Sequence, residues 1–267
     1  MHIHFLDPYQ EGNSPLHKID PRVLFVIIIG FIFTVSLVPA GDWPIYILLY
    51  SLVLSGEILS GIRVGYFLRR SLLALPFIIA AVPILFTLEG PALISVAIGE
   101  WNLSFSQAGL ERFLSILLKS WVSIQAAILL ATCMPFPDLL QAMRALGIPR
   151  LIVAVFALMW RYLFVFADEA VRLLRARAAR SGELETKNRK TGGSMLWRGR
   201  VAGGTVGGLL LRAYERSDNI YAAMVSRGYD GEVRSFPLPK LHSGDWLLLI
   251  LCFSLFSILL FSAYLFF

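Results

Sequence analysis

Five stretches of the chain are nearly free of charged residues, and each has about the length of a membrane-spanning helix. They cover residues 23–41, 43–61, 71–88, 120–137 and 246–267. A helix needs roughly 20 mostly apolar residues to cross the hydrocarbon core of a bilayer. A weaker stretch, residues 151–160, stops at Arg161 and is too short for a span. The pattern predicts an all-α, polytopic membrane protein with about five transmembrane helices, with four or six as the nearest alternatives.

The charges between these stretches predict which side of the membrane each loop faces. Lys18 and Arg22 precede the first stretch. The loop between the second and third stretches carries Arg63, Arg69 and Arg70, whereas the loop after the third carries Glu89, Glu100 and Glu111. Lys and Arg concentrate in short cytoplasmic loops. We therefore expect a multi-pass protein of the cell (inner) membrane, with the N-terminus in the cytoplasm and the C-terminus outside.

The composition agrees with a membrane protein and excludes several other classes. Hydrophobic residues make up 57% of the chain and charged residues only 16%, whereas soluble domains are about one quarter charged. A net charge of +6 alone would also suit a nucleic-acid-binding protein, but such a protein does not need long uncharged runs. The first apolar stretch is longer than the roughly 7–15 residues of a signal peptide, and further spans follow it. We expect no cleavage there, and we expect Cys133 and Cys252 to be buried as small hydrophobic residues.

Most of the basic residues lie in one block between the fourth and fifth stretches. Residues 138–240 hold 17 of the 24 Lys and Arg residues and nine acidic residues, which gives this block about +8 of formal charge. A large basic segment is expected on the cytoplasmic side. The sequence therefore predicts three parts: a membrane region with four spans (residues 1–137), a cytoplasmic coupling domain of long amphipathic helices (138–240) and a C-terminal span (241–267).

The basic block has the pattern of helices rather than of a loop. Asp138 can cap a short helix over 139–146, which Gly147 and Pro149 would end. No Gly or Pro interrupts residues 151–180, so we expect one long helix there, lying in or under the membrane, followed by a polar linker. In that helix Arg161 would reach the interface or pair with Asp168.

A third helix is predicted from apolar residues at three- and four-residue steps. They are Val206, Leu210, Tyr214, Ser217, Tyr221 and Met224, widened by Leu209, Ala213 and Ile220. This stripe suits packing on another helix or on the membrane surface, with Arg212 and Arg216 mostly on the opposite side. Four glycines near its start (Gly203, Gly204, Gly207 and Gly208) either allow another helix to approach closely or give flexibility.

The two long helices end in parallel ways, with an arginine between small residues. The first ends in Ala179-Arg180-Ser181 and the second in Ser226-Arg227-Gly228. An arginine at a helix C-terminus is favourable in any protein because that end carries partial negative charge. Alternatively, each end enters a groove in a partner, where the guanidinium group binds a carboxylate through two hydrogen bonds. Two such ends suit a partner that is present in two copies.

Four ordered motifs now show a family resemblance that covers nearly the whole chain. They are residues 14–22 (SPLHKIDPR), 137–149 (PDLLQAMRALGIP), 161–169 (RYLFVFADE) and 215–231 (ERSDNIYAAMVSRGYDG). The chain resembles the transmembrane T component of an energy-coupling factor (ECF) transporter, an ABC importer, in the cobalt-type CbiQ branch. Both helix ends would read Ala-Arg-Gly or Ala-Arg-Ser in that family, so Ser226 is a small-residue departure. Leu24 stands where the family often has lysine.

The resemblance implies a non-catalytic scaffold with several partners. It would link two cytoplasmic ABC ATPase subunits to a small substrate-binding membrane subunit of the cobalt or nickel type. Ala179, Arg180 and Ser181 would form the first ATPase-coupling motif, and Ser226, Arg227 and Gly228 the second. No cofactor, resident metal or nucleic acid is implied, and a vitamin is an alternative substrate. The sequence has no G-x-x-x-x-G-K-[ST] loop for nucleotide phosphates, so a partner would have to use the ATP.

Other candidate residues give weaker patterns. His2, His4 and Asp7, with His17 nearby, form a thin metal-site pattern at the N-terminus. Glu57, near the end of the second stretch, is expected at the membrane interface; the alternative is a functional site, for which an intramembrane acid is a candidate by default. A self-sufficient carrier or channel would favour internal repeats and polar residues in the spans, which are not seen. A membrane-embedded enzyme would need a convergent catalytic set, but neither H-E-x-x-H nor G-x-S-x-G is present.

Overall fold

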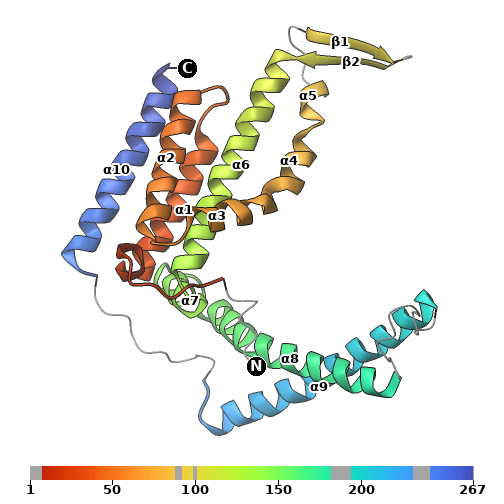
Figure 1. The fold of residues 1–267 in the computed structure, drawn as a ribbon. Coiled ribbons are helices and arrows are strands. Elements are labelled where there is room, and N and C mark those ends of the chain that lie inside the picture. Colours follow the sequence, from red (N-terminus) through yellow and green to blue (C-terminus); the bar gives the residue numbers. More distant parts are fainter. Residues whose placement is uncertain (1–7, 88–91, 99–100, 182–193, 231–240, 267) are drawn as a thin grey trace. The chain divides into compact units, whose positions relative to one another are not determined.

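A computed structural model describes residues 8–87, 92–98, 101–181, 194–230 and 241–266, and these residues form two compact units (Figure 1). The helix-pair unit contains α8 (Arg150–Ser181) and α9 (Met195–Ser226). The bundle unit contains every other described element.

The bundle unit is built around one long central helix. Its helices are α1 (Pro21–Leu37), α2 (Trp43–Leu59), α3 (Val64–Ser71), α4 (Leu75–Ala81), α5 (Ile84–Thr87), α6 (Gln107–Cys133), α7 (Phe136–Ala145) and α10 (Ser243–Phe266). Two short 3-10 helices, Pro15–Lys18 and Leu72–Ala74, and a two-stranded hairpin complete it. Helix α6 packs against α1 to α5, and α1 also packs against α7 and α10. One helix therefore organises most of this unit.

The core of the bundle is apolar, and so is much of its outer surface. Val35, Leu49 and Val122 are buried inside, and the rings of Phe31 and Phe256 meet at 5.8 Å between α1 and α10. On the outside, large apolar side chains such as Ile47 and Ile258 are exposed. Hydrogen-bonded helices with apolar outer faces suit a lipid environment.

Four segments are long and apolar enough to cross a membrane: Val64–Ala81, Gln107–Cys133, Arg150–Arg180 and Ser243–Leu265. The apolar helices α1 and α2 are slightly shorter, at 17 residues each. The predicted all-α, polytopic membrane fold is confirmed.

The predicted spans match the helices to different degrees. The first, second and fifth stretches form α1, α2 and α10. The third stretch is broken into short helices. Pro76 lies in the first turn of one of them, α4, and a turn at Val82-Pro83 ends α4. The fourth stretch lies in α6, which begins at Gln107, far before residue 120. The Ser106 hydroxyl accepts a hydrogen bond from the Gly109 backbone N–H and caps α6 at that point.

An antiparallel hairpin adds a small β element that the pattern of apolar stretches did not predict. Strand β1 (Ala92–Ile98) pairs with β2 (Trp101–Ser106), with Ile98 opposite Trp101 and an irregularity between Ala92 and Ile94. The hairpin leads directly into α6.

The short helix after the fourth span is confirmed as α7, but its start was predicted wrongly. The structure places Pro135 at the N-cap and Asp138 inside the first helical turn, with no capping role. Gly147 ends the helix in the left-handed conformation (φ +93°), as a residue without a Cβ atom can do readily.

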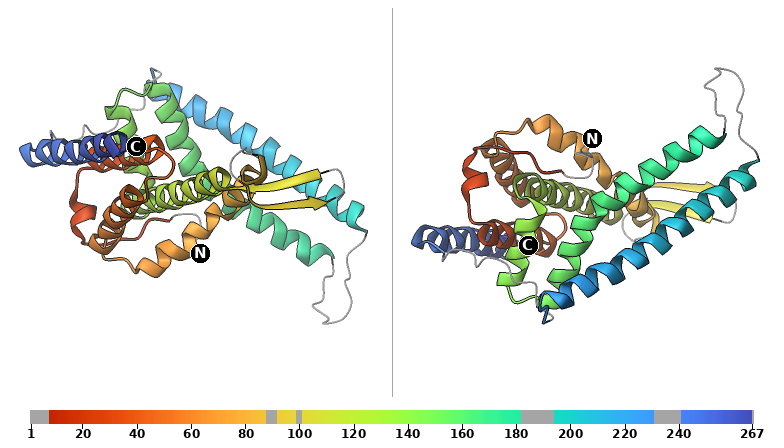
Figure 2. Two further views of the ribbon diagram at one scale, coloured as in Figure 1. Left: turned by 90° about the horizontal axis from the view of Figure 1, so that it is seen from above. Right: turned by 90° about the horizontal axis from the view of Figure 1, so that it is seen from below.

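In the helix-pair unit, α8 and α9 form an antiparallel pair of 32 residues each. They cross in Figure 1 and lie side by side in the views of Figure 2. The long helix expected from residue 151 to 180 is confirmed. The third predicted helix is also confirmed but begins at Met195, where the Ser194 hydroxyl accepts a hydrogen bond from the Trp197 backbone N–H.

Candidate coupling site

The second motif, Ser226-Arg227-Gly228, is held by an ordered helix termination. The backbone N–H of Gly228 donates to the Val225 carbonyl at 2.9 Å, and that of Tyr229 donates to the Met224 carbonyl at 3.0 Å. These two bonds form a Schellman motif, which places its closing residue in the left-handed region. Gly228 has φ +79°. The backbone that carries Arg227 is therefore fixed, while its side chain is exposed.

The first motif, Ala179-Arg180-Ser181, occupies the last turn of α8. Ala179 and Arg180 are exposed. Among the described residues, neither Arg180 nor Arg227 has an ion-pair partner. Both guanidinium groups are therefore available to a carboxylate supplied by another protein.

The two motifs lie at opposite ends of the helix pair. Because the helices are antiparallel, the last turn of α8 lies toward the beginning of α9, and the last turn of α9 lies toward the beginning of α8 (Figure 1). Two side-chain contacts fix this alignment, Glu169 with Arg212 and Tyr162 with Arg216. The helix pair thus presents one arginine at each end.

An open basic groove of about 640 Å³ runs between the last part of α8 and the first part of α9. Its lining includes Arg177, Arg180 and Arg212, the ring of Trp197, and the glycines Gly204 and Gly208. Apart from its own helix backbone, a Cβ atom added to either glycine would meet no atom of the described residues within 4 Å. The predicted close approach of another helix at these glycines is therefore not made by any described part of this chain.

The apolar stripe predicted on α9 divides into two faces. Leu209, Ala213, Ile220 and Met224 are half-buried. Val206, Leu210, Tyr214 and Tyr221 are 65%, 71%, 67% and 63% exposed. This second face remains available to a membrane surface or to another protein.

The prediction that Arg212 and Arg216 lie on the side away from the packing face is wrong. Arg212 forms a direct ion pair with Glu169 of α8, and the Arg216 guanidinium lies 5.4 Å from the centre of the Tyr162 ring. Periodicity places apolar residues on a common face but does not reveal that long arginine side chains can span the gap between two helices. The sequence reasoning missed this cluster, although it had identified Glu169 as part of a motif.

The acidic residue of the second apolar stretch, Glu57, is enclosed by the bundle. Its side chain is fully buried in α2. Within the described part of the chain, neither of its carboxylate oxygens has a hydrogen-bond partner, and the same holds for the amide atoms of buried Gln125 in α6. Arg161 is exposed, and among the described residues it forms no ion pair with Asp168.

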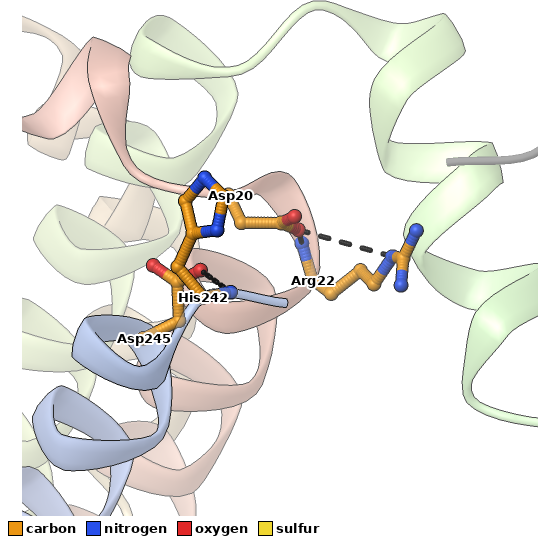
Figure 3. Close-up of polar contacts among 4 residues, drawn as sticks. All are labelled: Asp20, Arg22, His242 and Asp245. Carbon is orange, nitrogen blue, oxygen red and sulfur yellow. Dashed lines mark hydrogen bonds and ion pairs between the residues drawn. The ribbon is translucent and has the colours of Figure 1, made fainter. Parts of the chain in front are cut away.

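Several polar residues of the N-terminal motif are explained by local structure. The Asp20 carboxylate accepts a hydrogen bond from the Arg22 backbone N–H at 2.9 Å and caps α1 (Figure 3). At the start of α10, outside this motif, the Asp245 carboxylate accepts a hydrogen bond from the His242 backbone N–H at 2.9 Å (Figure 3). His17 bonds to the Ser14 hydroxyl at 2.6 Å. These contacts order the ends of helices.

The described residues offer no obvious metal centre. No group of three or more His, Cys, Asp or Glu side chains in this part of the chain is placed to hold an ion. His2, His4 and Asp7 lie outside the described residues. Cys133 is buried and Cys252 half-buried, and both are free thiols.

Comparison with known proteins identifies the family. The cobalt transport protein family CbiQ matches residues 12–237. An uncharacterized protein of Methanocaldococcus jannaschii is 24% identical over 259 residues, which cover 96% of this chain and 84% of that protein. The energy-coupling factor transporter transmembrane protein EcfT of Lactococcus lactis is 27% identical over 233 residues, with 84% and 83% covered. The cobalt transport protein CbiQ of Salmonella typhimurium is 28% identical over 122 residues, or 43% of this chain and 54% of that one.

These matches agree with the resemblance drawn from the sequence motifs, and none of the three names denotes an enzyme. The apolar helices and the family together describe a multi-pass membrane protein of a transport system. The chain belongs to the CbiQ family of cobalt transport proteins.

Proposed function

We propose that this chain is the T component of an ECF-type importer, a scaffold that couples ATP hydrolysis by two partner ATPases to reorientation of a substrate-binding membrane subunit. The observation that carries this proposal is a pair of exposed arginines, Arg180 and Arg227, at opposite ends of two antiparallel helices; neither arginine forms an ion pair with any residue that the structure describes. Each would bind one ATPase subunit. The scaffold itself hydrolyses nothing.

Each arginine is suited to such a contact by its chemistry and its surroundings. A guanidinium group stays charged at all relevant pH values and can bind a carboxylate through two parallel hydrogen bonds. Small neighbours, such as Ala179 and Gly228, allow a helix end to enter a groove. Once the contact excludes water, removing the arginine leaves a buried carboxylate unpaired, at a cost of roughly 2–5 kcal/mol.

Charge and helix direction support the proposed orientation. The starts of α1 and α10 lie at the same end of the bundle unit, and the junction of α2 and α3 lies there too (Figure 1). Lys18, Arg22 and Arg63 belong to this end. By the positive-inside rule we propose that it faces the cytoplasm, with residues 138–240 on the same side and the C-terminus outside.

The proposed cargo is a cobalt ion, with nickel as the alternative. The family name and the name of the Salmonella typhimurium relative both contain cobalt transport, whereas the EcfT name specifies no substrate. Uptake of labelled cobalt and nickel by cells that express the chain with its ATPases and substrate-binding subunit would distinguish the two ions.

The coupling role is tested by co-purification of the ATPases with Arg180→Glu, Arg227→Glu and the double variant. We expect each single variant to lose one contact and the double variant to lose the ATPases and uptake. Arg172→Glu is a matched control, since Arg172 is an exposed arginine of α8 away from both motifs. Normal assembly and uptake in the double variant would refute the proposal.

A further inference from the structure

The contacts between Glu169 and Arg212 and between Tyr162 and Arg216 lie near the middle of both helices. Glu169 and Tyr162 are seven residues apart on α8, so they share one face of that helix. Arg212 and Arg216 are four residues apart on α9 and also share one face. Together the two contacts form a polar and aromatic clamp between the helices.

On each helix, the clamp residue nearest to the proposed docking arginine precedes it by the same number of residues. Arg180 follows Glu169 by 11 residues (180 − 169), and Arg227 follows Arg216 by 11 residues (227 − 216). At 1.5 Å per residue each arm is about 16 Å long. Because the helices are antiparallel, the arms point in opposite directions, so the clamp lies between two arms of similar length.

The chemistry of the clamp suits a joint. Arginine side chains are long, so an ion pair and a cation–π contact can persist while the helix axes turn by a few degrees. Tightly interdigitated aliphatic side chains would resist such a turn. The Arg212 side chain is 57% exposed and the Glu169 side chain 31% exposed, so the pair is not locked in a core.

Space for movement exists beside the clamp. The basic groove, about 640 Å³, separates the α8 arm from the first part of α9. Gly204 and Gly208 line it without side chains, and a Cβ added to either would contact no described residue outside its own helix backbone within 4 Å. The α8 arm and the facing part of α9 can therefore approach each other without a steric clash at these positions.

We infer that the Glu169–Arg212 ion pair and the Tyr162–Arg216 contact form the pivot about which α8 and α9 turn when the partner ATPases close. The inference rests on the proposed coupling function, which it deepens. The four residues are positioning residues, which convert the displacement of one docking arginine into a matching displacement of the other.

The test uses the assembled transporter with spin labels at two exposed positions, Leu174 of α8 and Gly199 of α9, after Cys133 and Cys252 are replaced by Ala. The distance between the labels is measured with and without a non-hydrolysable ATP analogue. We expect the nucleotide to shorten this distance in the parent protein. In Glu169→Gln and Arg212→Gln we expect the shift to be lost and uptake to fall at least tenfold while both ATPases still co-purify.

Two further variants separate a pivot from a merely structural contact. The charge-swapped pair Glu169→Arg with Arg212→Glu is expected to restore both the shift and uptake. Gly204→Leu, which fills the groove, is expected to block the shift, whereas Gly203→Leu, outside the groove lining, is expected to leave it unchanged. Glu215→Gln, an exposed acid on α9, serves as the charge control.

Unchanged label distances and uptake in the neutralised variants would overturn the pivot while leaving the docking proposal intact. Loss of the ATPases in those variants would also overturn it, because the clamp would then act in assembly. Failure of the docking proposal has a different signature, which is normal ATPase binding by the Arg180→Glu, Arg227→Glu double variant.

Discussion

Gly109 of α6 lies directly against the backbone of Leu85 in α5. A Cβ atom at position 109 would stand 2.9 Å from the Leu85 carbonyl oxygen and 3.1 Å from that of Ile84. Backbone atoms at these distances cannot move aside as a flexible side chain can. The close approach allows α5 and the start of α6 to pack together.

Gly109→Ala is therefore expected to destabilise the bundle. Overpacking of this kind costs about 1–3 kcal/mol, which exceeds the gain of about 1 kcal/mol in helix propensity from glycine to alanine. Thermal unfolding in detergent measures the effect. Gly65→Ala is the control, because its added Cβ would meet nothing within 4 Å. Equal melting temperatures for both variants would contradict the close approach.

Gly228 is expected to be required for the second coupling motif. Its left-handed conformation costs other residues about 1–2 kcal/mol, so Gly228→Val should loosen the turn that holds Arg227. We expect weaker binding of one ATPase and little change at Arg180. Gly228→Asn should retain more binding, since asparagine tolerates this conformation. Equal ATPase retention by the valine and asparagine variants would argue against a role for the turn.

Asp138 gives a pH-dependent prediction. Burial raises the pKa of its carboxyl group above the ordinary aspartate value of about 3.9. A raised pKa in the folded state means that the protonated form is favoured by folding. Its contribution to stability is therefore present at low pH and is lost as the pH rises from about 4 through the raised pKa.

Asp138→Asn should accordingly become more stable relative to the parent as the pH increases from 4 to 7. The difference in melting temperature between the two proteins, measured across this range, checks the prediction. A difference that stays constant with pH, or that changes in the opposite direction, would show that burial does not control this group.

Replacing Glu57 or Gln125 with an apolar residue is expected to stabilise the protein. Both are fully buried, and their side-chain polar atoms have no hydrogen-bond partner among the described residues. An unsatisfied buried polar group costs about 1–3 kcal/mol, so Glu57→Met and Gln125→Leu should raise the melting temperature. Ser60→Ala is the contrasting variant and should not raise the melting temperature, because the Ser60 hydroxyl is satisfied: it donates to the backbone carbonyl of Glu57 at 2.6 Å. Lower stability in Glu57→Met would indicate a bound water or a functional partner for the carboxylate.

Much of the helical architecture could be predicted from the sequence because its causes are local. The end of α9 follows from Gly228, and α1, α2 and α10 follow from uninterrupted apolar runs. The hairpin was missed, although only two residues, Gly99 and Glu100, separate its strands, a spacing typical of hairpins. Its apolar residues lack clean alternation, and three acidic residues made the region resemble a loop.

The candidate site was only partly predictable for a different reason. The two arginine motifs are contiguous in sequence and can be recognised there. The pairing of Glu169 with Arg212 joins residues 43 positions apart, so it depends on the antiparallel alignment of two helices. The burial of Glu57 likewise depends on how α2 packs in the bundle, which hydropathy does not encode.

The antiparallel course of α8 and α9 has a geometric consequence for a protein without an internal repeat. Two antiparallel helices of equal length are related by a local twofold axis perpendicular to them, and here that axis passes near the clamp. The axis exchanges the end carrying Arg180 with the end carrying Arg227. A single asymmetric polypeptide can thus present a quasi-symmetric face, and so match a dimer whose own dyad points along the same line.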